Sequence, residues 1–150
     1  MPLLSVPKAR ALIRDALTGN ALLPTHSGYF TDATPDIELS GLEGHDFYWQ
    51  QYYCQHLRLG KVDGKAMPEA SRISPSAFRV DARHGFAHPA IEAGFGHLIP
   101  AARVQGIAAM GVQNSYNAAT LGYHTGTRAG AGLFAIGATN EVPTVAPTCA

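Results

Sequence analysis

Two pairs of small polar residues follow two apolar segments in the second half of the chain. Asn114-Ser115 comes directly after the apolar stretch 107–112, and Thr139-Asn140 follows the stretch 133–136. Both stretches have the length and composition of buried strands. Hydroxyl and amide groups held at the ends of rigid strands are typical of binding clefts, because the strands fix them while nearby loops stay open. The pattern predicts that these residues line a small-molecule site.

Periodicity predicts the elements that position these residues. A strand is expected at 77–81, whose side chains alternate as in an exposed edge strand. Residues 61–76 are expected to form a loop, and 21–39 give no clear pattern because Pro and Gly interrupt them. Pro100 is expected to kink or break its helix, and Gly132 to end another. Apolar residues at helical spacing predict four helices, at about 6–17, 46–59, 89–104 and 120–131.

The segment 101–147 resembles the malate/L-lactate dehydrogenase family, whose fold is not of the Rossmann type. The matching residues, in order and without gaps, are Ala102, Arg103, Gly106, Asn114, Ser115, Gly122, Tyr123, Gly132, Thr139, Asn140, Pro143, Val145, Ala146 and Pro147. The resemblance implies a mixed α/β fold with an N-terminal helical segment (1–76) and the first half of a cofactor-binding sheet domain (77–150). It also implies an NAD or NADP cofactor.

His45 lies in the segment 41–46, where the family has a Gly-x-Asp-Ser-His-Gly motif. The resemblance implies that His45 is the acid/base that exchanges a proton with the substrate hydroxyl. Its chemistry suits the role, because an imidazole with an ordinary pKa of ~6.5 can both give and take a proton at neutral pH. Gly44 and Asp46 replace the Ser and Gly of the family motif. The alternative is a surface or capping histidine at a helix start.

Three residues depart from the family pattern. Trp49 stands where the family commonly has an arginine that clamps a carboxylate, so it either favours an apolar or aromatic substrate or only packs in the core. Asn117 replaces a histidine, and an amide can form hydrogen bonds but cannot transfer a proton at pH 7. His124 replaces a tyrosine, either compensating for Asn117 or serving structure. Expected cofactor-binding residues are Ser115, Asn117, Thr139 and Asn140; expected substrate-binding residues are Trp49 and His124.

Composition argues against several classes of function. Eleven Lys and Arg balance eleven Asp and Glu, so no basic face invites nucleic acid and no polybasic run invites anionic lipid. No apolar run is long enough to cross a membrane. Cys54 and Cys149 lie far apart in the sequence and are expected to be reduced thiols, which favours a cytoplasmic protein; the alternative is a single disulfide between them. His84 and His88 lack further ligands nearby, so no metal site is expected.

Three functional hypotheses remain open at this point. The first is that the chain is the N-terminal half or subunit of an NAD(P)-dependent oxidoreductase acting on a 2-hydroxy or 2-oxo acid or an imine. The second keeps the scaffold as a self-processed acyl or amide transferase or hydrolase, with its nucleophile at the N-terminus of a second chain. The third is a non-catalytic binding or regulatory half. Because family members are longer, we expect a second polypeptide to complete the fold, and the pair to form a higher homo-oligomer.

Overall fold

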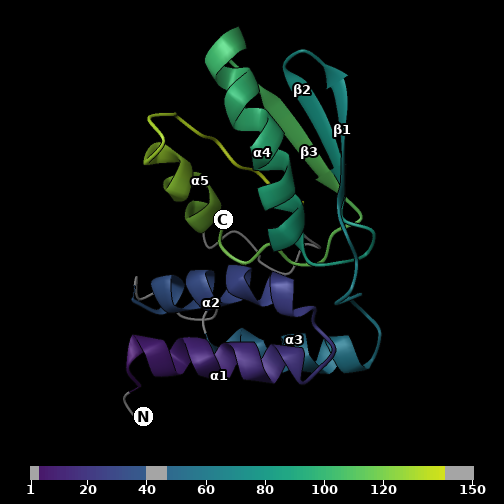
Figure 1. Ribbon diagram of the computed structural model, residues 1–150, viewed down its shortest axis with the longest axis vertical. Coiled ribbons are helices and arrows are strands. Elements are labelled where there is room, and N and C mark those ends of the chain that lie inside the picture. The colour runs from purple at the N-terminus through teal and green to yellow at the C-terminus, as the bar shows by residue number, and fades with distance from the viewer. Residues whose placement is uncertain (1–3, 40–46, 141–150) are drawn as a thin grey trace, which may run out of the picture. The chain divides into compact units, whose positions relative to one another are not determined.

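The computed structural model describes residues 4–39 and 47–140, whose helices and strands are shown in Figure 1. The described chain forms two compact units, one ending at Thr120 and the other beginning at Leu121. The predicted domain boundary between 1–76 and 77–150 stays a prediction. In chain order the elements are α1 (Val6–Thr18), α2 (Pro24–Leu39), α3 (Phe47–Arg58), β1 (Glu69–Ser74), β2 (Ala77–Asp81), α4 (Ala87–Gln105), β3 (Ala109–Gln113) and α5 (Leu121–Ala129).

The first unit contains a three-stranded mixed sheet with the strand order β1-β2-β3. Strands β1 and β2 pair antiparallel across a tight turn, whereas β2 and β3 pair in parallel and are joined by α4. Helix α4 lies over one face of the sheet (Figure 1), where it buries Phe78 and Val80 of β2. The mixed α/β fold class predicted from the sequence is confirmed.

Helix α4 packs closely against the sheet at Gly94. A Cβ atom added there would clash with Met110 Sδ and lie 3.0 Å from Val80 Cγ2, so these side chains would have to shift to admit it. Two residues further along, Gly96 is exposed and has nothing within 4 Å of the same added atom. Gly94 is one close contact among several, because Ala90, Ile91 and Phe95 of the same helix also pack against side chains of the sheet.

Helices α1, α2 and α3 pack together as a layer beside the sheet (Figure 1). Their shared core is built from large apolar side chains, of which Ile13, Leu17 and Phe30 are almost completely buried. The layer also contains a buried polar link, because Gln50 Nε2 donates a hydrogen bond to Thr34 Oγ1 at 2.9 Å. Only one end of this amide is satisfied, because Gln50 Oε1 is buried without a hydrogen-bond partner in the described part of the chain.

Two elements escaped the sequence analysis. Helix α2 runs through the stretch that gave no pattern, because buried Ser27, Thr31 and Thr34 blur the apolar face that Phe30 and Ile37 mark. Ser27 Oγ and Thr31 Oγ1 donate to the carbonyl oxygens of Pro24 and Gly28, within the helix itself. Strand β1 lies inside the expected loop. Most of its residues are exposed, so it carries little apolar alternation.

Two strand predictions were wrong in part. Strand β2 lies at the centre of the sheet and not at an edge. The alternation of buried and exposed side chains along β2 shows that one face of the strand is covered, and it does not show the place of the strand in the sheet. Residues 133–140 form no strand in the described chain. Phe134 and Ile136 are 90% and 85% exposed, and no described segment pairs with them. An apolar run becomes a strand only when a neighbour completes its hydrogen bonds.

The remaining elements lie close to their predicted positions, and their ends differ by one or two residues. Gly132 has a φ of +75° just after α5, as expected for a residue that ends a helix. Pro100 does not break α4, which continues to Gln105. Ser5 occupies the N-cap position of α1 through its backbone, although its side chain makes no capping hydrogen bond.

We predict that Gly94→Ala lowers the free energy of unfolding by about 1–2 kcal/mol, because the new methyl group overpacks the contact with Met110 and Val80. Gly96→Ala on the same helix is the matched control. It should be neutral or stabilise by up to about 1 kcal/mol through helix propensity alone. Denaturant titrations of both variants measure the difference. Equal stabilisation by the two substitutions would show that the close approach at Gly94 carries no cost.

Candidate functional site

Helix α3 presents a row of ring side chains on one face, because Trp49, Tyr53 and His56 recur at helical spacing. Tyr53 is 3% exposed, whereas Trp49 and His56 are half-buried. The Trp49 ring lies 6.4 Å from the Tyr53 ring and 5.3 Å from the Tyr52 ring, measured between centroids. Trp49 thus packs against the core and still keeps part of its indole open.

The turn after β3 is held by a carboxylate. Asn114 has a left-handed φ of +52°, and its Nδ2 atom donates to both carboxylate oxygens of Asp81 at 3.1 and 3.2 Å. The backbone N–H of Arg83 donates to the same carboxylate at 2.8 Å. These donors, the Arg83 amide first, lower the pKa of Asp81, so the carboxylate stays charged and keeps its acceptors available. The ends of the parallel strands β2 and β3 are thereby tied together.

The next residues are fixed by the backbone of the β2–α4 loop. The N–H of Tyr116 donates to the carbonyl oxygen of Gly85 at 2.8 Å, and the N–H of His84 donates to the carbonyl of Asn114 at 2.8 Å. Gly85 fits here because a Cβ atom would lie 2.7 Å from the Ala66 methyl carbon. Three contacts therefore fix the backbone path of residues 114–116: the bond from Asn114 to Asp81 and the two backbone hydrogen bonds just described.

Tyr53 joins α3 to this turn. Its hydroxyl donates to Asn117 Oδ1 at 3.2 Å across 64 positions of sequence. Asn117 Oδ1 also accepts a hydrogen bond from the backbone N–H of Ala119 at 2.6 Å. Burial, and then the neighbouring phenol of Tyr116, raise the pKa of Tyr53, so its hydroxyl stays protonated and able to donate.

A second link runs beside the first. His56 Nδ1 lies 2.5 Å from the hydroxyl of Tyr116, and the two rings meet edge to face. Burial, and then the charge of Lys61, lower the pKa of His56, which favours the neutral imidazole at pH 7. A neutral ring can accept the Tyr116 proton at Nδ1 and leave Nε2 as the donor. The only signal for this pair in the sequence was the place of His56 on the Tyr53 face of α3.

The structure brings together part of the predicted site. Trp49 and Asn117 both contact Tyr53, so these two altered positions belong to one cluster. Ser115 is exposed two residues before Asn117. His45 lies outside the described residues.

The other predicted residues belong to the second compact unit. His124 is 4% exposed and its ring lies 5.4 Å from the ring of Tyr123. Thr139 and Asn140 are exposed, and Thr139 Oγ1 donates to the carbonyl oxygen of Asn140 at 3.4 Å. The roles assigned to these three residues remain predictions.

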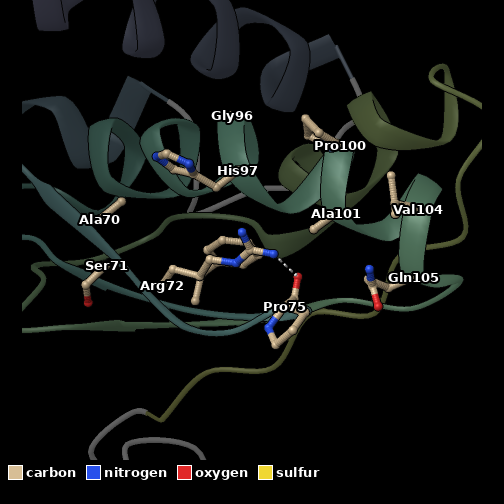
Figure 2. A pocket seen from close by; sticks show the side chains of 11 residues that line it. Ala70, Ser71, Arg72, Pro75, Gly96, His97, Pro100, Ala101, Val104 and Gln105 are labelled. Atoms are coloured by element: carbon tan, nitrogen blue, oxygen red, sulfur yellow. Dashed lines mark hydrogen bonds between the residues drawn. The ribbon is translucent and has the colours of Figure 1, made fainter.

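A hollow of about 650 Å³ lies between the β1–β2 hairpin and α4 (Figure 2). The Arg72 guanidinium lies 6.0 Å from the centre of the Phe78 ring and donates to the carbonyl oxygens of Ser74 and Pro75. His97 stacks on the same ring at 5.8 Å. The hollow contains none of the predicted site residues. The turn uses two of the five N–H donors of Arg72, which fixes the direction of its guanidinium.

In the part of the chain that the structure describes, no three His, Cys, Asp or Glu side chains gather as metal ligands would. His84 is exposed with a φ of +62°, whereas His88 is buried with its ring 4.6 Å from that of Phe30. None of the described helices is both long and apolar enough to span a membrane.

Known proteins resemble this chain in sequence and in fold. The sequence profile of the family described as malate/L-lactate dehydrogenase matches residues 4–150. A delta(1)-pyrroline-2-carboxylate reductase of Ancylobacter novellus is 34% identical over 118 residues, which are 79% of this chain and 35% of that protein. The (2R)-3-sulfolactate dehydrogenase (NADP(+)) of Chromohalobacter salexigens is 35% identical over 112 residues, 75% of this chain and 33% of that protein.

Solved structures agree in fold. The delta1-piperideine-2-carboxylate reductase of Pseudomonas syringae superposes with a TM-score of 0.83 at 28% identity, over 88% of this chain and 40% of that one. Malate dehydrogenase of Pyrococcus horikoshii gives a TM-score of 0.80 at 20% identity, over 86% of this chain and 37% of that one. The chain thus spans well under half the length of the relatives that it matches.

Proposed function

The chain belongs to the malate/L-lactate dehydrogenase family, and we propose that it forms part of an NAD(P)-dependent oxidoreductase acting on a 2-hydroxy acid, a 2-oxo acid or a related imine. The relatives described above are a reductase of an imine carboxylate and a dehydrogenase of a hydroxy acid, as their names state. Both classes of substrate carry a carboxylate beside the carbon that gains or loses hydride. The proposal therefore concerns a small organic acid.

One observation carries this proposal: Trp49 and Asn117, which come from distant parts of the sequence, both contact Tyr53. Trp49 is half-buried with part of its ring open, and Asn117 is half-buried with its oxygen already bonded. An apolar surface beside a few directed polar groups is the usual make-up of a small-molecule site. The cluster is the best-formed arrangement of this kind around the predicted residues.

The described residues fit a nicotinamide cofactor in their chemistry. Ser115 offers an exposed hydroxyl, and Thr139 and Asn140 offer further hydroxyl and amide groups in the second unit. Such neutral donors and acceptors suit the amide and hydroxyl groups of a dinucleotide. The cofactor would supply hydride transfer, and the protein would supply binding and orientation. We assign these residues, with Asn117, to the cofactor side of the site.

The amide at Asn117 limits what the site can do with protons. An amide donates and accepts hydrogen bonds but does not ionise near pH 7, so Asn117 orients a partner and does not move a proton. The proton of the reaction is then assigned to His45, which precedes α3 in the sequence. His124 and Trp49 are assigned to substrate binding, His124 from the second unit.

The described chain also leaves apolar side chains uncovered. Val104 and Ile107 are 79% and 77% exposed in the first unit, and Phe134 and Ile136 are more exposed still in the second. The matched reductase structure is far longer than the region that this chain covers. We therefore propose that further polypeptide of the family fold covers these residues, and that the complete protein forms a homo-oligomer.

The cofactor prediction is tested on the complete assembly of this chain with that further polypeptide. NADH or NADPH should enhance or shift its fluorescence with a saturable titration at micromolar to millimolar concentration, because the site orients the nicotinamide ring near Trp49. Residues 1–150 alone should give no saturable signal. Silence of the complete assembly with both cofactors, together with turnover of an ester or amide, would instead support the transferase or hydrolase alternative.

The substrate prediction concerns the missing arginine. Malate should be a poor substrate, because the loss of a bidentate ion pair at Trp49 is expected to cost ~2–4 kcal/mol, or roughly one to three decades in affinity. Trp49→Arg should recover part of the kcat/KM for malate, whereas Trp49→Phe, the aromatic control, should not. Efficient turnover of malate by the unmodified protein, or no response to Trp49→Arg, would contradict this assignment of Trp49.

A further inference from the structure

The side-chain amide of Asn117 has a defined orientation. Its oxygen faces the backbone N–H of Ala119 at 2.6 Å, and an N–H group can only donate. The atom at that position must therefore be the oxygen, and the opposite assignment of the amide is excluded. Nδ2 has no hydrogen-bond partner in the described part of the chain, and it is not among the buried atoms that lack one. Nδ2 is thus an open donor.

Tyr53 is the second support of this orientation. Its ring is held edge to face by Phe30, Phe86 and Tyr116, with centroids 5.9, 5.4 and 5.9 Å away. A ring packed on three sides fixes the position of its hydroxyl oxygen, which lies 3.2 Å from Asn117 Oδ1. The raised pKa of Tyr53 keeps the hydroxyl protonated.

We propose that Tyr53 is a positioning residue that acts through Asn117: it holds the amide oxygen inward, so that Nδ2 presents N–H donors to an oxygen acceptor of the bound ligand. This inference rests on the proposed function and adds a selection rule to it. Nδ2 favours a carboxylate or carbonyl oxygen and disfavours a group that itself donates. Two ligands could supply that oxygen, the substrate carboxylate or the carboxamide of the nicotinamide.

Three variants of the complete assembly separate these effects. Tyr53→Phe removes only the hydroxyl, and Asn117→Asp keeps both inward hydrogen bonds while replacing the open donor by an oxygen. Tyr52→Phe is the matched control, because the Tyr52 hydroxyl bonds to Tyr48 at 2.9 Å and not to Asn117. For each variant, KM, kcat, the dissociation constant of the reduced cofactor and the melting temperature are measured.

Tyr53→Phe should weaken ligand binding about two- to tenfold, the usual effect of one hydrogen bond, and Asn117→Asp by roughly tenfold or more. A rise in KM alone identifies the substrate as the ligand, and a rise in the cofactor dissociation constant identifies the nicotinamide. Tyr52→Phe should stay within about twofold of the unmodified protein. In an Asn117→Ala background, Tyr53→Phe should have no further effect, because the residue through which it acts is gone.

A measurement that requires no enzymatic activity distinguishes the positioning role of Tyr53 from the proposed function. The side-chain amide of Asn117 gives a pair of NMR resonances, assigned by their loss in Asn117→Asp, and these should shift or broaden in Tyr53→Phe but not in Tyr52→Phe. Such a change in a protein that binds no nicotinamide would refute the proposed function and leave the positioning role in place. Unchanged resonances with unchanged KM and cofactor affinity, or effects of Tyr53→Phe that multiply with Asn117→Ala, would overturn the positioning role.

Discussion

The arrangement depends on the contact between Tyr53 and the turn that follows β3. Tyr53 belongs to the core of the helical layer, and its hydroxyl and ring also hold Asn117 and Tyr116. Helical layer and sheet therefore share one buried aromatic cluster, which Phe86 completes from the β2–α4 loop. Aromatic rings packed edge to face tolerate little displacement. A shift of α3 would move both Trp49 and Asn117, the two residues that we assign to ligand binding.

The fold could be predicted where apolar periodicity was strong. Four helices followed from it, and Gly132, expected from its residue type to end a helix, lies shortly after the end of α5 at Ala129. The mixed α/β fold class was expected from the family resemblance. The misses have physical causes. The buried face of α2 includes Thr and Ser side chains that donate to carbonyl oxygens of their own helix, so the sequence shows no clear apolar stripe. Most residues of β1 are exposed, so its sequence shows little alternation of apolar and polar residues. The run 133–136 lacks a neighbouring strand in the described chain, which no local pattern could reveal.

The candidate site was predictable in part. Trp49 and Asn117 could be singled out as departures from a resemblance, but their joint attachment to Tyr53 is a tertiary contact over 64 positions. The same holds for the contact between His56 and Tyr116, over 60 positions. Spacing along a helix shows which residues share a face, and it cannot show what that face meets. The amide orientation of Asn117 likewise depends on the N–H of Ala119.

We propose that the cluster of Trp49, Tyr53 and Asn117 forms one wall of a nicotinamide and substrate site. A crystal structure of the complete assembly with a reduced cofactor and a non-reacting 2-oxo acid tests it most directly. We expect an oxygen of the substrate or of the carboxamide within about 3.2 Å of Asn117 Nδ2, with the indole of Trp49 against the same ligand. Both ligands bound elsewhere, with Asn117 facing only solvent, would contradict it.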